Sequence, residues 1–244
     1  MVIGVEADSR GATANPACQS VVVPAYFYPD AGWTRADESW PVPGIMILDI
    51  TGIGAGTSPD REYQAAAARA QAAGIEVMGY SATDYGRRPA AAVEADVRNY
   101  RAWYHVTNIF LDQSSSGVGQ LAYYRALSGY IHRVNPGSTV MLNPGTFPDR
   151  RYMSIGDIVM VYENTFARLA ALQVPSWADD YPAAKFAFAI YATPDSGLAG
   201  AIAMSEKRHA GYVYVTDGTL PDPYGSLPGY WPSEDSIIAA RCAE

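Results

Sequence analysis

The chain has 244 residues, of which 49% are hydrophobic and 17% are charged, and its formal net charge at pH 7 is -8. This length suits a single α/β barrel, and the composition supports a large core, which excludes wholesale disorder. A negative chain without Lys and Arg clusters argues against a nucleic-acid partner, and no apolar run approaches the roughly 20 residues that cross a bilayer.

Eight short runs of apolar, β-branched and aromatic residues recur along the chain. In chain order they are "VVVPAYFYP" (21–29), "IMILDI" (45–50), "IEVMGYSAT" (75–83), "NIFLDQ" (108–113), "STVMLNPGT" (138–146), "DIVMVYEN" (157–164), "KFAFAIYAT" (185–193) and "GYVYVTD" (211–217). Nearly continuous apolarity is typical of strands that are covered on both faces, which favours a parallel sheet.

Longer segments between and after these runs are expected to form helices. They cover residues 59–74, 89–104, 119–137, 195–211 and 233–244. Asp60 is expected near the start of the first helix, and Gly74 should end it. Asp195 or Ser196 is expected to cap the fourth helix. The connection over 30–44 contains Trp and Pro, and no helix is predicted there.

Strands that alternate with helices predict a single (β/α)8 TIM-type barrel. Residues 18–244 are assigned to the barrel, and residues 1–17 to an N-terminal extension for which disorder is one option. The first and last strands of a closed barrel are neighbours, which brings Cys18 and Cys242 to the same region. A disulfide between them is one expectation, and two buried free thiols are the alternative.

Polar residues close most of the predicted strands, and in this architecture the carboxyl ends of the strands carry the active site. They are Tyr26, Tyr28, Asp49, Tyr80, Thr83, Asp84, Asp112, Gln113, Asn143, Glu163, Asn164, Tyr191, Thr216 and Asp217. This set offers no nucleophilic Cys, no His base and no metal cluster, so neither a cofactor nor a metal is expected. It suits sugar chemistry, in which carboxylates supply acid, base and nucleophile, and aromatic rings stack on sugars.

Two acids are predicted to be functional. Asp112 and Glu163 each close an apolar strand, and Glu163 has no Gly or Pro nearby to explain it as a turn former. Burial would raise the pKa of Glu163, as a general acid requires. The acids Asp49, Asp84 and Asp217 stand beside Gly or Thr, and a helix cap or Asx turn is slightly favoured for them over a role at the site.

Seven segments appear in the same order as in a known family: "VVVPAYFYP", "GYSATDYGRR", "DVRNYRAWY", "IFLDQ", "LNPGT", "DIVMVYE" and "GYVYVTDGTLPDPYGSLPGYW". On these segments, which run from about residue 21 to 232, the chain resembles the spherulin-4 proteins (spherulation-specific family 4), glycoside hydrolase family 135. The resemblance implies a secreted or cell-surface barrel glycosidase. It also implies cleavage of α-1,4-linked N-acetylgalactosamine-containing polymers such as galactosaminogalactan.

The resemblance implies catalytic positions as well. The family carries an Asp-Glu pair that ends the fourth strand and a Glu that ends the sixth. Asp112 and Glu163 fall on the first and last of these positions, whereas Gln113 falls where the family has Glu. An amide cannot exchange a proton at neutral pH. Three accounts stay open: Asp112 and Glu163 suffice, the chain is an inactivated variant, or it binds sugar without chemistry.

The remaining expectations concern the substrate. Besides the two acids and Gln113, the residues expected to contact the polysaccharide are Tyr26, Tyr28, Asp49, Tyr80, Asp84, Asn143, Tyr191, Asp217 and Trp231. Of the tryptophans, Trp33 and Trp231 fall in loops and are the predicted sugar platforms. The segment "LDITGIG" (48–54) departs from the family pattern, so its substrate contacts should differ.

An acidic cleft should attract cationic, partly deacetylated galactosamine polymers, and their binding should weaken with salt. The protein is expected to be a monomer. A rival reading is an unrelated barrel enzyme acting on phosphorylated sugars, for which "TPDSGLAG" (193–200) is a weak match to a phosphate loop.

Overall fold

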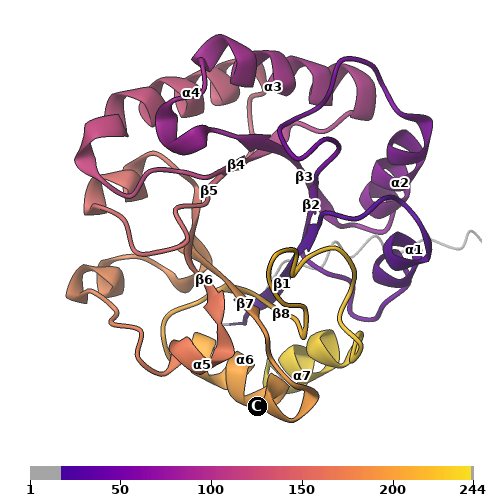
Figure 1. Ribbon diagram of the computed structural model, residues 1–244, viewed down its shortest axis with the longest axis vertical. Coiled ribbons are helices and arrows are strands. Elements are labelled where there is room, and N and C mark those ends of the chain that lie inside the picture. The colour runs from indigo at the N-terminus through magenta and orange to yellow at the C-terminus, as the bar shows by residue number, and fades with distance from the viewer. Residues whose placement is uncertain (1–17, 243–244) are drawn as a thin grey trace, which may run out of the picture.

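Eight parallel strands close into a barrel in the computed structural model, which describes residues 18–242 (Figure 1). The strands are β1 (Ser20–Ala25), β2 (Ile45–Leu48), β3 (Glu76–Ala82), β4 (Asn108–Asp112), β5 (Val140–Leu142), β6 (Ile158–Thr165), β7 (Phe186–Tyr191) and β8 (Tyr212–Val215). Each predicted run overlaps one strand, and β8 pairs with β1. The predicted (β/α)8 barrel is therefore confirmed, while the extension assigned to residues 1–17 lies outside the described residues.

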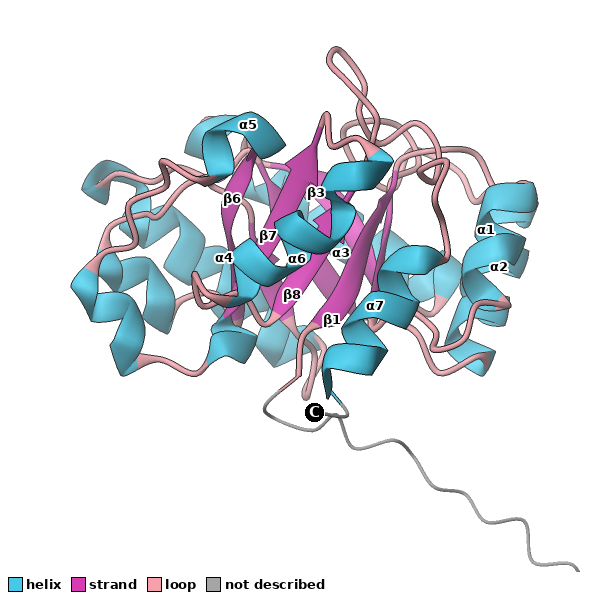
Figure 2. Ribbon diagram, turned by 90° about the horizontal axis from the view of Figure 1, so that it is seen from below, coloured by secondary structure: helices cyan, strands magenta, loops and turns pink. Residues whose placement is uncertain are grey.

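Helices surround the barrel, as the side view shows (Figure 2). They are α1 (Ala31–Asp37), α2 (Arg61–Ala72), α3 (Ala90–Tyr104), α4 (Leu121–Val134), α5 (Phe166–Leu169), α6 (Leu198–Glu206) and α7 (Ser233–Cys242). No helix in this part of the chain is long and apolar enough to span a membrane.

The strands are buried on both faces. The helices cover the outside of the barrel, and side chains from the strands fill its interior. All residues of β2 and of β5 are buried, which is the pattern of strands in a covered parallel sheet. Gly79 on β3 shows how closely a helix packs, since a Cβ at this position would lie 2.5 Å from the ring of Tyr100 on α3. The Tyr100 hydroxyl also donates to the carbonyl of Leu48 on β2 (3.2 Å).

The start of α2 follows the sequence prediction. The Asp60 side chain accepts hydrogen bonds from the backbone N–H groups of Glu62 (2.9 Å) and Tyr63 (3.3 Å), which makes it the N-cap. Gly74 follows the helix with a φ of 89°, a left-handed conformation that glycine adopts without strain.

Two helix predictions are wrong. The connection over 30–44 does contain a helix, α1, which begins where the Asp30 side chain accepts from the N–H of Gly32 (2.7 Å). The buried ring of Trp33 holds this short helix against the barrel. Neither Asp195 nor Ser196 caps α6, because the chain enters that helix through a 3-10 turn and its N-cap, Gly197, has no side chain.

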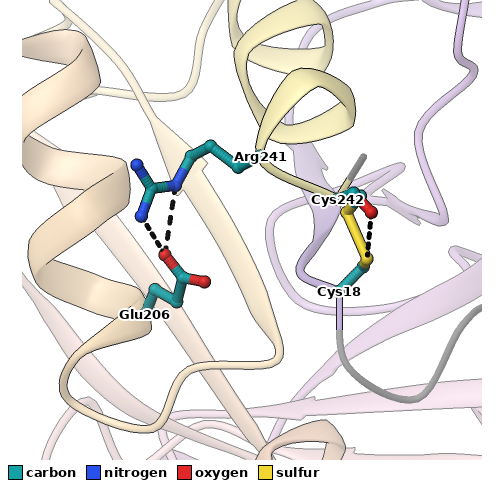
Figure 3. The surroundings of a disulfide bond; sticks show 4 residues. All are labelled: Cys18, Glu206, Arg241 and Cys242. Carbon is teal, nitrogen blue, oxygen red and sulfur yellow. Dashed lines mark hydrogen bonds and ion pairs between the residues drawn. A yellow bond between two sulfur atoms is a disulfide. The ribbon is translucent and has the colours of Figure 1, made fainter. Parts of the chain in front are cut away.

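A covalent bond joins the start of the barrel, before β1, to its last helix, α7. Cys18 precedes β1, Cys242 ends α7, and a disulfide links them with their Cα atoms 5.3 Å apart (Figure 3). Beside it, Arg241 of α7 forms an ion pair with Glu206 of α6. Of the two alternatives for the cysteines, the structure has the disulfide.

Candidate active site

Asp112 and Glu163 are brought together by the strand that lies between theirs. Asp112 ends β4 and Glu163 belongs to β6, and β5 pairs with both strands. Asn143 follows β5, and its Nδ2 donates to Oδ1 of Asp112 (2.7 Å) and to Oε2 of Glu163 (2.7 Å). The two acceptor oxygens are therefore no more than about 5.4 Å apart, twice 2.7 Å. We refer to Asp112 and Glu163 as the acid pair.

The orientation of the Asn143 amide is fixed by its own turn. Its Oδ1 accepts from the backbone N–H of Gly145 (2.9 Å), which leaves the NH₂ group facing the acid pair. Gly145 has a φ of 64°, and its carbonyl accepts from the backbone N–H of Glu163 (3.2 Å). The segment Asn-Pro-Gly after β5 thus forms a turn that positions a donor between the acids.

Asp112 lies in a ring of hydrogen-bond donors. Burial raises the pKa of Asp112, and hydrogen bonds from Tyr80, from the backbone of Gln113 and from Asn143 oppose this rise. The Tyr80 hydroxyl donates to Oδ2 of Asp112 at 2.7 Å. These donors favour the carboxylate over the neutral acid.

Glu163 has a different electrostatic environment. Burial raises the pKa of Glu163, and the negative charge of Asp112 raises it further, against the hydrogen bond from Asn143. Two close carboxyl groups titrate as a coupled pair. Because Asp112 has more donors, it ionises first, and its charge then makes the ionisation of Glu163 less favourable.

A cavity of about 340 Å³ opens beside Glu163. Its lining consists of Tyr26, Glu163, Tyr191, Leu220, Pro221, Asp222, Pro223 and Tyr224. The Tyr26 ring packs edge-on against Tyr80 (5.4 Å between centroids) and Tyr224 (5.6 Å), so aromatic side chains connect the cavity wall to Asp112. The structure thus groups the predicted residues Tyr26, Tyr80, Asn143 and Tyr191 with the acid pair.

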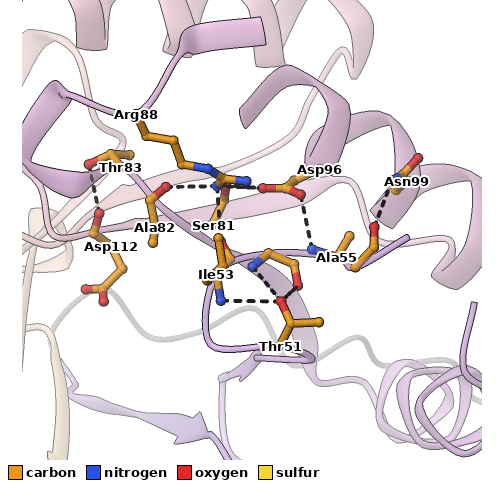
Figure 4. A network of polar contacts seen from close by, with 12 residues as sticks. Thr51, Ile53, Ala55, Ser81, Ala82, Thr83, Arg88, Asp96, Asn99 and Asp112 are labelled. Carbon is orange, nitrogen blue, oxygen red and sulfur yellow. Dashed lines mark hydrogen bonds and ion pairs between the residues drawn. The ribbon is translucent and has the colours of Figure 1, made fainter. Parts of the chain in front are cut away.

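A polar network behind the site fixes the loops that follow β2, β3 and β4 (Figure 4). Asp96 of α3 accepts from the hydroxyl of Ser81 (2.7 Å) and from the backbone N–H of Ala55 (3.3 Å), and pairs with Arg88 (2.8 Å). The Thr83 hydroxyl donates to the backbone carbonyl of Asp112 (2.8 Å). The backbone that carries Asp112 is therefore held in place independently of any substrate.

The side chain of Gln113 takes no part in the Asn143 bridge, the two hydrogen bonds that Asn143 donates to the acid pair. Its side chain is exposed and makes no hydrogen bond to either acid among the described residues. Its backbone has a φ of 50°, and its carbonyl accepts from the hydroxyl of Thr83 (2.9 Å). The observed contacts of this position are those of the backbone.

Asp49 is one of the acids for which a helix cap or turn is favoured, and its contacts are those of a turn. Asp49 accepts from the N–H groups of Thr51 (3.2 Å) and Gly52 (2.7 Å), which is an Asx turn. Burial raises the pKa of Asp49, and the charge of Asp112 contributes, so this acid lies near the pair. Roles for these acids in substrate binding stay predictions.

Two further acids and one tyrosine are not part of the cluster around the acid pair. Asp84 forms an exposed ion pair with Arg87, and Asp217 accepts from the N–H of Gly229 (3.4 Å). Tyr28 is 54% exposed, and its hydroxyl lies 3.5 Å from both carboxylate oxygens of Asp60. Their contacts with a substrate also stay predictions.

The prediction that two tryptophans are sugar platforms is wrong. Trp33 is 0% exposed and donates through Nε1 to the carbonyl of Phe27 (3.2 Å). Trp231 is 5% exposed and donates to the carbonyl of Arg35 (3.4 Å). The segment after β8 folds back onto α1, so both rings pack inside the protein and have no free face for a sugar.

The sequence prediction missed residues of the segment after β8, among them Leu220, Asp222 and Tyr224. This segment has no periodicity that indicates which side chains face the barrel mouth, although it belongs to the motifs that carry the family resemblance. Among residues 18–242, no group of three or more His, Cys, Asp or Glu side chains is arranged to hold a metal ion.

Comparisons with known proteins agree on one family. A family model for spherulation-specific family 4 (Spherulin4) matches residues 20–238. Spherulin-4 from Physarum polycephalum is 30% identical over 234 residues, which cover 90% of this chain and 70% of that protein. The structure of Sph3 from Aspergillus clavatus in complex with GalNAc has a TM-score of 0.78 at 25% identity, covering 91% of this chain and 98% of Sph3.

More distant structures share the fold alone. The chitinase RmChi1 from Rhizomucor miehei has a TM-score of 0.53 at 10% identity, covering 90% of this chain and 99% of the chitinase. Together the comparisons indicate that this chain is a relative of carbohydrate-binding proteins or glycoside hydrolases.

Proposed function

The chain belongs to spherulation-specific family 4, and on this premise we propose that it is a glycoside hydrolase of polysaccharides that contain α-1,4-linked N-acetylgalactosamine or galactosamine. The observation that carries the proposal is the amide of Asn143, which bonds both Asp112 and Glu163. Two carboxyl groups at this spacing, next to a cavity lined with tyrosines, are the catalytic groups that cleavage of a glycosidic bond requires.

The electrostatics of the acid pair suggest the role of each member. Glu163 keeps its proton because burial and the charge of Asp112 raise its pKa, so it can protonate the leaving oxygen of the glycosidic bond. Asp112 is the member that ionises first, so it can attack or stabilise the positive anomeric carbon.

The spacing of the acid pair favours retention of anomeric configuration. Retaining glycosidases hold their carboxyl groups about 5–5.5 Å apart, whereas inverting enzymes need about 6.5–9.5 Å to admit a water molecule. The limit of about 5.4 Å set by Asn143 agrees with the first class. A covalent intermediate on Asp112 would give this outcome.

Participation of the acetamido group of the substrate is a second route to retention. In that route the acetamido oxygen attacks the anomeric carbon, and Asp112 orients the group; the attack needs a leaving oxygen trans to the acetamido group, so it suits β-linked units, and the cis arrangement of an α-linked unit favours the covalent route. The two routes differ in their substrates, because only the covalent route can cleave a fully deacetylated galactosamine polymer. Comparing turnover of acetylated and deacetylated polymers separates them.

A non-catalytic carbohydrate-binding protein is the second candidate function. It is favoured by one observation, the amide of Gln113 at a position where the family resemblance implies Glu. The exposed side chain of Gln113 lies outside the Asn143 bridge, which supports the account in which Asp112 and Glu163 suffice.

The proposal includes secretion or display at the cell surface. The disulfide between Cys18 and Cys242 supports this location, since disulfides persist in oxidising compartments. Both members of the acid pair come from one chain, so a monomer is sufficient for the proposed chemistry.

The test is the release of reducing ends from galactosaminogalactan. The wild-type protein should release them, and Asp112→Asn and Glu163→Gln should each lower turnover by about 100- to 10,000-fold, the usual contribution of such groups. The matched control is Asp180→Asn, which removes an exposed carboxylate paired with Arg150 (2.9 Å) and should leave turnover unchanged. Wild-type turnover in both acid-pair variants would refute the proposal.

A further inference from the structure

Tyr224 carries a buried hydroxyl without a partner next to Glu163. The residue is 4% exposed, and among the described residues its hydroxyl makes no hydrogen bond. Burial raises the pKa of Tyr224, and the nearby carboxylate of Glu163 raises it further. The hydroxyl is therefore close to the acid, yet outside hydrogen-bond geometry with it. Buried polar groups of this kind are rare in proteins and call for an explanation.

The surroundings of Tyr224 hold its ring in one place. The ring packs edge-on against Tyr26 (5.6 Å between centroids) and tilted against Tyr214 (6.2 Å). The backbone N–H of Tyr224 donates to Asp222 (3.3 Å), which stabilises the turn that precedes it. Tyr224 and Asp222 both line the cavity of about 340 Å³ that contains Glu163.

We propose that Tyr224 is a substrate-binding residue, whose hydroxyl donates a hydrogen bond to an oxygen of the amino sugar that occupies the cavity beside Glu163. This inference rests on the proposed function and adds a residue to its site. A sugar offers two classes of acceptor here, the acetamido carbonyl and the ring hydroxyls. The tyrosine stays protonated and remains a donor across the working pH range, because burial raises its pKa well above the ordinary value of a tyrosine.

Tyr214 provides a matched control within the same barrel. Its hydroxyl is also buried and unpartnered among the described residues. However, the largest influence on its pKa after burial is the charge of Glu234 and not that of Glu163, and Tyr214 does not line the cavity beside Glu163. Removing this hydroxyl changes the same chemical group at a position outside the lining of the cavity.

The experiment compares Tyr224→Phe with Tyr214→Phe. Each substitution deletes a hydroxyl that has no partner in the protein, so both variants should fold with melting temperatures equal to or above that of the wild type. The Kd for N-acetylgalactosamine, measured by NMR titration, should rise about tenfold in Tyr224→Phe and less than twofold in Tyr214→Phe, the loss expected for one hydrogen bond. The value of kcat/KM should fall in parallel.

Comparing N-acetylgalactosamine with galactosamine identifies the sugar oxygen that accepts the hydrogen bond from Tyr224. If Tyr224 bonds the acetamido oxygen, the loss appears with N-acetylgalactosamine and not with galactosamine; if it bonds a ring hydroxyl, both ligands lose affinity. An unchanged Kd for both ligands in Tyr224→Phe, or an equal loss in Tyr214→Phe, would overturn the inference.

The result also separates this inference from the proposed function. A wild-type protein that binds N-acetylgalactosamine through Tyr224 but releases no reducing ends supports Tyr224 and contradicts the hydrolase. A wild-type protein that cleaves the polymer, with no effect of Tyr224→Phe on binding or turnover, supports the hydrolase and contradicts Tyr224.

Discussion

Asn143 couples the two carboxyl groups through one amide. Because each hydrogen bond from this amide favours the charged form of its acceptor, Asn143 lowers the pKa of both Asp112 and Glu163 against the effect of burial. It also holds the oxygens at the spacing that the chemistry needs. A residue of this kind affects both the rate and its dependence on pH.

The substitution Asn143→Ala should therefore change the pH profile of the reaction. Without the amide, both pKa values rise, so both limbs of the profile of kcat/KM against pH should move to higher pH. We expect kcat/KM to fall by about tenfold or more, as for a lost hydrogen bond to a charged group. Asn164→Ala is the control, because the side chain of Asn164 bonds only the backbone N–H of Thr165 (2.9 Å) in the described structure. Lower activity with unmoved limbs would contradict the coupling.

Gln113 provides the second prediction at this scale. Since its side chain is exposed and unbonded to the acid pair, Gln113→Glu should change kcat/KM by less than about tenfold. The measurement is turnover of galactosaminogalactan by both forms. A gain of about 100-fold or more, the usual contribution of a general acid or base, would instead identify the chain as a variant that lacks a catalytic acid.

Among the elements, α7 contains an unusual pair of buried acids. Glu234 is fully buried and accepts from the backbone N–H of Val215 on β8 (2.8 Å), and Asp235 is buried beside Ser39. Burial raises the pKa of Glu234 well above its ordinary value, and it raises the pKa of Asp235 to about 7. Asp235 is therefore predominantly neutral when the folded protein is in mildly acidic solution, and burial shifts Glu234 in the same direction.

The pH dependence of stability follows from these shifts. An acid with a raised pKa in the folded state binds its proton more tightly there than in the unfolded chain, so folding is favoured at low pH and loses stability as the pH rises above the unfolded pKa. Glu234→Gln keeps the acceptor for Val215 and removes the titration. Between pH 4 and pH 8, the free energy of unfolding of the wild type should fall more steeply than that of the variant, by about 1.4 kcal/mol per pH unit between the two pKa values. Parallel curves in denaturant unfolding would contradict this account.

The strands and the longer helices were predictable, whereas the short helix α1 was not, for a physical reason. A strand of a covered parallel sheet needs apolar residues on both faces, so runs such as "IMILDI" stand out. The helix α1 has only seven residues, and its stability comes from the cap of Asp30 and the burial of Trp33, which are tertiary and local contacts that leave no periodic pattern.

The same reasoning explains which site residues could be predicted. Asp112 ends an apolar strand, Asn143 follows one directly, and Glu163 lies near the end of one, so the barrel geometry alone predicts that they converge. Tyr224 lies nine residues beyond β8 in a segment whose path is set by packing against Tyr26 and Tyr214. No local feature of the sequence indicates that it reaches Glu163.

For the whole molecule, the disulfide is a covalent link between the two ends of the described part of the chain. It joins residues separated by 224 positions, and in the chain-entropy model a loop of this length stabilises the fold by about 5 kcal/mol. The double variant Cys18→Ser, Cys242→Ser should therefore lose about 2–5 kcal/mol of unfolding free energy in urea. Wild-type protein treated with a reductant should match it, and an unchanged midpoint in both would show that the bond adds nothing to stability.

The central claim is that the acid pair cleaves a glycosidic bond with retention. Time-resolved proton NMR of the wild-type protein with an α-1,4-linked N-acetylgalactosamine polymer tests this most directly, since it detects each new reducing end and its anomer before mutarotation. The account predicts that the α-anomer appears first, because the oxygens of Asp112 and Glu163 lie no more than about 5.4 Å apart. First appearance of the β-anomer, or no new reducing end at all, would contradict it.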